Sequence, residues 1–77
     1  MSSSYSEEEK IYLVKTGEHI RESRIAIGLS QEKLSFESNL DRTYIGSVER
    51  GERNISIINL RKIATALKTN PSELLKF

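Results

Sequence analysis

The sequence contains no cysteine and no tryptophan, and only one histidine and one proline among its 77 residues. Without cysteine there can be no disulfide framework and no zinc site built on thiolate ligands. The single histidine, His19, offers little for metal binding or acid–base chemistry, and we expect it at the surface. The chain also lacks a nucleophile–base constellation and a phosphate-binding loop. We therefore expect no metal, no cofactor and no enzymatic activity.

Long apolar runs are missing as well, since nowhere does the chain have the roughly 20 apolar residues that a membrane-spanning helix needs. Residues 1–9 lack both the basic start and the apolar stretch of a secretory signal. We therefore expect a cytoplasmic protein without a membrane segment. The length suits one domain, residues 1–77, with residues 1–6 as a flexible tail. A core of this size is marginal for a monomer, so a homodimer is expected.

Neither sign of charge dominates, because the formal net charge is +1. Residues 1–30 hold four Lys/Arg and five Glu, whereas residues 31–77 hold eight Lys/Arg and six Asp/Glu. The small positive excess thus lies in the second part of the chain. A solvated surface of mixed charge gives the same total, so the charge alone indicates no partner.

The first helical segment is predicted to begin after Ser6 and to end near Gly28. Ser6 and Glu9 have the spacing of a capping box, and glycine is the common residue just past a helix end. Between these two ends, residues at helical spacing form one stripe that is expected to face the core. Its members are Leu13, Gly17, Ile20, Arg24 and Ile27.

Four shorter helices are predicted to follow, which makes the domain all-α. Ser30 can cap a helix that runs to about Ser38, and Asp41 can cap the next one, which ends before Gly51; Asn39 suits the turn between them. Ser56 can cap a fourth helix. There Ile55 and Leu60 have the spacing of a hydrophobic staple, and the inner stripe is Leu60, Ile63, Ala64 and Leu67. A short fifth helix opens at Asn70 and Pro71, with proline at the first helical position.

Residues 30–54 thus form two short helices joined by a tight turn, the anatomy of a helix-turn-helix DNA-binding motif. From about Ile20 to the C-terminus the chain resembles the family of lambda-type repressors, Cro proteins and Xre-like regulators. It is most similar to the controller proteins of restriction-modification systems, which share the run Asn39 to Ile45 nearly as it stands here. The resemblance implies a five-helix, lambda-repressor-like DNA-binding domain. The family usually has proline at Ile55, so the entry to the fourth helix is less rigid here.

The second helix of this motif is predicted to have one packed side and one free side. At 100° per residue, Ile45, Val48 and Glu49 share one side, and Thr43, Gly46, Ser47 and Arg50 share the other. In such motifs the first residues of this helix enter the major groove, which makes base contacts by Arg42, Thr43 and Tyr44 an expectation. The resemblance adds Ser47 to the base-reading positions.

Arg42 is the strongest candidate for specificity, because its planar fork can contact guanine O6 and N7 together. The Thr43 methyl suits the thymine methyl, and Tyr44 could serve bases or phosphate. The alternative is that these are ordinary polar residues at a solvated helix start. Gly46 lies inside a helix, where glycine is less stable than alanine. Close approach to DNA or to a neighbouring helix would each account for it.

Contacts to the DNA backbone are expected from the segment that follows, where charge supplies affinity without sequence preference. The candidates are Arg50, Arg53 and Asn54, and the alternative is a solvated, charged loop. The resemblance adds Gln31, at a position where the family touches phosphate and braces the DNA-contacting helix.

Arg24 and Glu49 both fall on packed sides of their helices, so each needs a partner. We expect them to pair with each other, and the resemblance implies the same ion pair. The alternative is an exposed pair that contributes almost nothing.

Dimerisation is expected to use apolar residues that the core leaves over. These are Ile57, Ile58, Leu75 and Phe77, whereas Leu74 suits the chain's own core. The alternative is that all of them close the monomer core. No position is predicted for Ile11, Val14, Ile25 and Phe36.

Together these expectations describe a sequence-specific transcription regulator that binds double-stranded DNA. The resemblance implies a restriction-modification controller that binds palindromic operators upstream of its own gene and of the endonuclease gene, activating at first and then repressing. Activation would need RNA polymerase, and Glu32 is the candidate for a contact with its sigma subunit. The alternatives are a phage or plasmid repressor, an Xre-like antitoxin, and a helical protein-binding module without DNA binding.

Overall fold

The computed structural model describes residues 4–77, and within that range it contains five α-helices and no strand. This confirms the predicted all-α class and the order of the helices. Residues 1–3 of the expected tail lie outside the described residues, and residues 4–6 precede the first helix. The helices are α1 (Glu7–Ala26), α2 (Gln31–Ser38), α3 (Arg42–Glu49), α4 (Ile57–Ala66) and α5 (Pro71–Leu74).

Serine side chains cap the starts of three helices, as the sequence predicts. Ser6 and Glu9 form a complete capping box at the start of α1. Ser30 Oγ accepts the backbone N–H of Lys33 at 3.0 Å, and Ser56 Oγ accepts that of Asn59 at 3.1 Å. Asp41 stands at the cap position of α3, but its side chain makes no cap hydrogen bond, so its predicted capping is wrong. Asn70 and Pro71 open α5 as predicted.

Two residues with positive φ end the helices that lead into the motif. Gly28 has φ +75° after α1, and Asn39 has φ 59° in the turn between α2 and α3. Both agree with the predicted roles. Ile27, however, is 44% exposed, so its assignment to the inner stripe of α1 is wrong. The helix ends at Ala26, and Ile27 therefore leaves the helical phase of the stripe.

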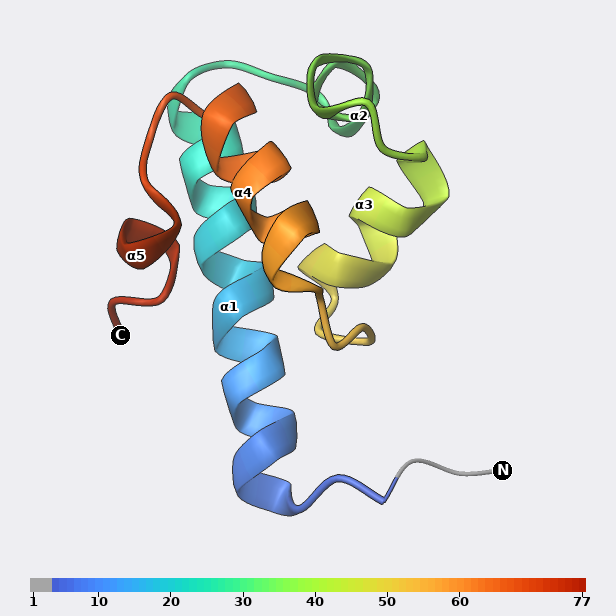
Figure 1. Cartoon of the computed structure of the whole chain (residues 1–77), viewed down its shortest axis with the longest axis vertical. Helices are drawn as coiled ribbons and strands as arrows, with labels where there is room; N and C mark the ends of the chain where they lie inside the picture. Colours follow the sequence, from blue (N-terminus) through green and yellow to red (C-terminus); the bar gives the residue numbers. More distant parts are fainter. Residues whose placement is uncertain (1–3) are drawn as a thin grey trace.

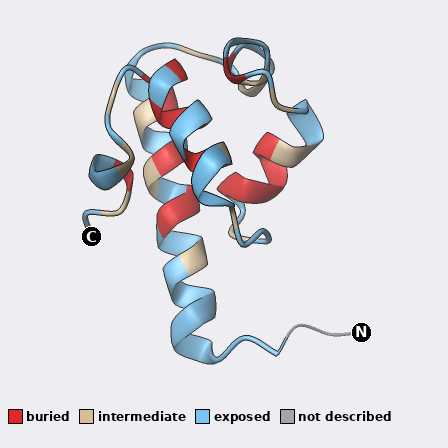
Figure 2. Cartoon of the chain, in the orientation of Figure 1, coloured by how far each residue is buried: buried red, intermediate tan, exposed pale blue. Residues whose placement is uncertain are grey.

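The core lies where the second half of α1 meets the other helices. In the view of Figure 1, α4 passes in front of this half, with α2 and α3 on one side and α5 on the other. In Figure 2 the buried segments gather there, while the first half of α1 is exposed. Among residues 4–77 no helix is long and apolar enough to cross a membrane. The buried apolar residues are Ile20, Leu34, Ile45, Val48, Leu60, Ile63, Ala64, Ala66, Leu67 and Leu74.

Gly17 sets the closest approach between two helices. A Cβ atom at this position would overlap the carbonyl oxygens of Val48 and Glu49 at the end of α3. Backbone atoms cannot move aside as a flexible side chain can, so α3 can lie this close to α1 only because residue 17 is glycine. This contact fixes where the end of α3 sits.

The four apolar residues without a predicted position are all exposed in this chain. Ile11 and Ile25 are half exposed, Val14 is 41% exposed and lies against the loop at Gly51, and Phe36 is 79% exposed. None of the four belongs to the core.

Candidate nucleic-acid interface

The inward side of α3 is fixed to the rest of the domain. Ile45 is fully buried, Val48 is 3% exposed and Glu49 is 6% exposed. These are the three residues that the sequence places on the packed side. The helix therefore has a defined rotation about its axis, and that rotation determines which side chains face solvent.

An ion pair joins the end of α3 to α1, as predicted. Arg24 Nε donates to Glu49 Oε2 at 2.7 Å and Arg24 Nη2 to Oε1 at 3.1 Å, with both side chains at least nine-tenths buried. Gln31 Nε2 donates to the same carboxylate at 2.9 Å, and Arg24 Nη1 donates to the Leu29 carbonyl at 2.7 Å. The alternative of an exposed pair is therefore wrong. Gln31 braces α3 from the start of α2, and its contact with DNA stays a prediction.

The start of α3 is open to solvent. Arg42 and Thr43 are exposed, and within residues 4–77 no hydrogen bond or ion pair engages either side chain. The other two arginines near this surface, Arg50 and Arg53, both have partners in the chain. Arg42 is thus the guanidinium that can contact a ligand without first giving up a bond.

Gly46 is buried by basic side chains that fold over it. A Cβ atom there would lie 3.2 Å from Arg50 Nη1, 3.4 Å from Arg42 Nη1 and 3.7 Å from Gln31 Oε1. No backbone of a neighbouring helix comes this close. The glycine therefore makes room for guanidinium groups on the outward side, and the expected alternative of a close helix contact applies to Gly17 instead.

Ser47 lies below this surface, so its expected place on a free side is wrong. It is 5% exposed because the Arg53 side chain folds back over it. Its hydroxyl donates to the Tyr44 carbonyl at 2.8 Å and accepts from Arg53 Nε at 3.0 Å. A base contact by Ser47 stays untested, but both bonding functions of its hydroxyl are occupied.

Tyr44 is half buried and is held by residues from outside α3. Its ring packs against the core, and Arg53 Cζ lies 5.4 Å from the ring centroid. Asn59, on α4, donates from Nδ2 to the Tyr44 hydroxyl oxygen at 3.2 Å. Asn59 was not among the functional residues predicted from the sequence. A single side-chain contact across 15 residues leaves no periodic signal in a sequence.

Arg50 is paired with Glu52 in the loop after α3. Nε and Nη2 of Arg50 donate to the two carboxylate oxygens at 2.9 and 3.1 Å. The hydrogen bond to Glu52, reinforced by its charge, raises the pKa of Arg50, and the hydrogen bond from Arg50 lowers the pKa of Glu52. Both groups are exposed, so a phosphate can replace the carboxylate at little cost.

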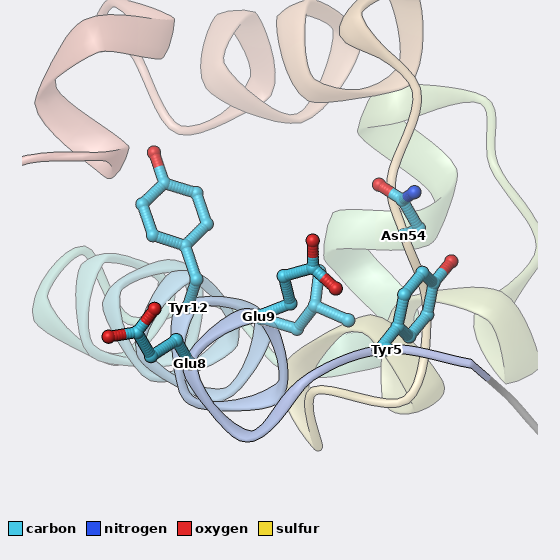
Figure 3. A pocket seen from close by; sticks show the side chains of 6 residues that line it. Tyr5, Glu8, Glu9, Tyr12 and Asn54 are labelled. Carbon is cyan, nitrogen blue, oxygen red and sulfur yellow. The ribbon is translucent and has the colours of Figure 1, made fainter.

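Asn54 lines a hollow of about 320 Å³ against the first turns of α1. Figure 3 shows Tyr5 and Asn54 on one side of it and Tyr12 on the other, with Glu9 between them. The carboxylates of Glu8 and Glu9 make this hollow unfavourable for phosphate. Asn54 is itself exposed, and its predicted backbone contact would have to be made on the side away from the hollow.

The four residues expected at a dimer interface differ in exposure. Ile57 is 79% exposed and Ile58 is 59% exposed, whereas Leu75 is half buried against the core. Phe77 is 47% exposed, and its ring contacts the rings of Tyr12 and His19 of its own chain at centroid distances of 5.1 and 5.5 Å. Of these four residues, the two most exposed are therefore those in the first turn of α4. Buried Leu74 is confirmed as a core residue.

Glu32 is exposed on α2, one helical turn before exposed Phe36. Within residues 4–77 no three His, Cys, Asp or Glu side chains are placed to hold a metal ion. The candidate binding surface is therefore the set of polar side chains on α3 and in the loop that follows it.

Comparisons with known proteins agree with this geometry. A family model described as helix-turn-helix matches residues 20–74. The chain is 48% identical over 62 residues to the control protein C.BamHI of Bacillus amyloliquefaciens, covering 79% of this chain and 76% of that one. It is 50% identical over 58 residues to the control protein C.SmaI of Serratia marcescens, covering 75% and 69%. The crystal structure of the restriction-modification controller protein C.AhdI from Aeromonas hydrophila superposes with a TM-score of 0.79 at 60% identity, covering 80% of this chain and 94% of that one.

Proposed function

This chain belongs to the helix-turn-helix family, a family of DNA-binding transcription regulators, and we propose that it controls a restriction-modification system by binding the promoters of that system's genes. The observation that carries the proposal is the open start of α3 on a helix whose other side is locked. Arg42 and Thr43 are exposed and without partners among residues 4–77, and the buried Arg24–Glu49 pair fixes the helix beneath them. The proposal implies that the protein acts in the cytoplasm, where it would reach these promoters.

The base contacts in this proposal belong to the first turn of α3. Arg42 binds guanine through its two-pronged guanidinium, the Thr43 methyl contacts a thymine methyl, and Tyr44 approaches from the side of α4. Arg53 lies over Ser47, beside Tyr44, so its charge is held next to these groups rather than trailing along the loop. Arg50, Asn54 and Gln31 flank this turn and contact phosphates, which fix the position of the protein on the duplex.

The second element of the proposal is a homodimer formed through α4. Two isoleucines exposed in the first turn of one helix favour association with a second copy, because burying them removes apolar surface from water. A two-fold axis there would place two copies of α3 about 34 Å apart, one turn of DNA, and so match a palindromic operator. Leu75 and Phe77 extend this surface at the chain end.

The dimer can be tested with one charged substitution. Ile57→Asp should shift the protein from dimer to monomer in sedimentation equilibrium while its helical circular dichroism stays unchanged, because the side chain is exposed in the monomer. Phe36→Asp, an equally exposed apolar residue on α2, is the matched control and should leave the mass unchanged. A dimer that survives Ile57→Asp would place the interface elsewhere.

The regulatory part of the proposal is activation when one dimer is bound and repression when more dimers assemble on the operator. Activation needs a contact with RNA polymerase, which we assign to exposed Glu32 on α2 and the sigma subunit. Glu32→Gln should abolish activation from the chain's operator in a reconstituted transcription assay without changing operator affinity. Loss of both together would indicate a role for Glu32 in DNA binding instead.

The function itself is tested by selecting duplexes from a random-sequence pool with the purified protein at near-physiological salt. The proposal predicts enrichment of a two-fold symmetric sequence, and a match to it upstream of a methyltransferase or endonuclease gene. If no sequence is enriched, the regulator proposal fails, and a helical protein-binding module takes its place.

A further inference from the structure

The Tyr44 side chain has little freedom to move. The core supports its ring, the Arg53 guanidinium covers the ring face, and the Asn59 amide holds the hydroxyl oxygen. Asn59 is itself placed by the start of α4, since its backbone N–H is bound to the Ser56 cap. Among residues 4–77, no acceptor is bound to the Tyr44 hydroxyl hydrogen.

The direction of the Asn59 hydrogen bond determines how that hydrogen can be used. A phenol hydroxyl can donate one hydrogen bond and accept others. Asn59 Nδ2 donates to the hydroxyl oxygen, so the O–H bond is directed away from α4. We propose that Asn59 is a positioning residue that makes the Tyr44 hydroxyl a hydrogen-bond donor toward DNA. This inference rests on the proposed function and adds a residue from outside the helix-turn-helix.

The proposal defines the chemical group that Tyr44 selects. A fixed donor requires an acceptor, which on DNA is guanine O6 or N7, adenine N7, thymine O4 or a phosphate oxygen. Binding would be disfavoured where the Tyr44 hydroxyl faces the amino group of cytosine, because both groups are hydrogen-bond donors. A base edge and a phosphate both offer acceptor oxygens or nitrogens. They can be distinguished because only a base contact makes the affinity depend on the DNA sequence.

The test compares five variants with the wild type on the selected duplex and on duplexes with one base pair changed. The three single variants are Tyr44→Phe, Asn59→Ala and Asn59→Asp. The two double variants combine each Asn59 substitution with Tyr44→Phe. Thr65→Ala is the control on the same helix, because Thr65 is exposed and makes no side-chain hydrogen bond within residues 4–77. Thermal unfolding of each variant shows whether the fold is retained.

We expect Asn59→Ala to weaken binding about three- to tenfold, the range of one hydrogen bond. The loss should not exceed that of Tyr44→Phe, because the hydroxyl can still donate when it is not oriented, and it should disappear when Tyr44 is already Phe. Asn59→Asp should also weaken binding, because a carboxylate only accepts and would draw the hydroxyl hydrogen inward. Its effect in the Phe background gives the contribution of the added negative charge alone.

A loss that depends on the identity of one base pair of each half-site would identify a base acceptor. An equal loss on all duplexes would identify a phosphate, and the salt dependence should not change because the hydroxyl carries no charge. The inference is overturned if Asn59→Ala binds as the wild type does, if its effect persists without the Tyr44 hydroxyl, or if Asn59→Asp retains full affinity. A wild-type protein that binds no duplex would overturn the proposed function as well, so the two failures are distinguishable.

Discussion

The two sides of α3 differ in how their polar groups are used. On the inward side the Glu49 carboxylate accepts three hydrogen bonds from Arg24 and Gln31. On the outward side Arg42 and Thr43, within two turns of the same helix, have no partner among residues 4–77. A buried charge must be paired, whereas an exposed one can wait for a ligand. One eight-residue helix thus separates the groups that hold the fold from those that can bind DNA.

The boundary between the two sides is graded. Gly46 and Ser47 point outward by helical geometry, yet the side chains of Arg42, Arg50 and Arg53 cover them. The outward surface is therefore made of arginine side chains lying over two small residues. Small residues at positions 46 and 47 leave room for these side chains.

The strongest test of the inward side is removal of one partner of the buried ion pair. Arg24→Ala should lower the free energy of unfolding by about 3–5 kcal/mol, because it leaves the Glu49 charge buried and unpaired. Urea denaturation followed by circular dichroism measures this. Arg21→Ala, at an exposed position of the same helix, is the control, and an equal effect of the two substitutions would show that the pair does not hold α3.

A second test compares the two glycines that lie on opposite sides of α3. Gly17→Ala should destabilise the fold by about 1–3 kcal/mol, since the added methyl overlaps the backbone of Val48 and Glu49. Gly46→Ala meets only the ends of flexible side chains and gains about 1 kcal/mol of helix propensity, so the stability should be unchanged or higher. Equal losses of stability in both variants would contradict the distinction between the two sides.

On the outward side, Arg42→Ala should leave the stability unchanged and reduce discrimination at one base pair per half-site by about 1–3 kcal/mol. Equilibrium binding to the selected duplex and its single-base-pair variants measures the change. Arg42→Lys should bind more tightly than Arg42→Ala but regain little of the discrimination, because an ammonium group cannot make the bidentate contact. Unchanged discrimination in Arg42→Ala would exclude Arg42 as a base contact.

The smallest expected effect concerns the ion pair that competes with phosphate for Arg50. Glu52→Gln should tighten binding to all duplexes a few-fold and steepen the salt dependence by about one unit of the log–log slope. Because the pKa of Glu52 is lowered in the fold, its pair with Arg50 forms fully above the ordinary carboxyl pKa and is lost only as the pH falls through the lowered value. The effect of the substitution should therefore not change with pH near neutrality. Weaker binding by Glu52→Gln would show that Glu52 assists DNA binding.

The local features of the fold could be predicted from the sequence, because each depends on residues three or four apart. The Ser6, Ser30 and Ser56 caps are of this kind. Ile27 was wrongly assigned to the inner stripe of α1, because the spacing of apolar residues does not define the last residue of a helix. Arg24 could be predicted as the partner of Glu49, because both residues fall on packed sides of their helices and the family resemblance implies the same pair.

The details of the outward surface could not be predicted in the same way. Which of three arginines is engaged depends on the path of long side chains, and Arg53 could fold back over Ser47 only because the loop turns at Gly51. The Asn59 contact likewise depends on how α4 is placed beside α3. Helical periodicity separates inside from outside, but it does not specify hydrogen bonds between side chains of different elements.

The central claim is that the outward side of α3 contacts bases while its inward side only supports it. Isotope-filtered nuclear Overhauser measurements between labelled protein and the unlabelled selected duplex test this most directly. We predict contacts from the Thr43 methyl and the Tyr44 ring to major-groove base protons, with none from the first half of α1. Base contacts made only from another surface, with α3 remote from the duplex, would contradict the claim.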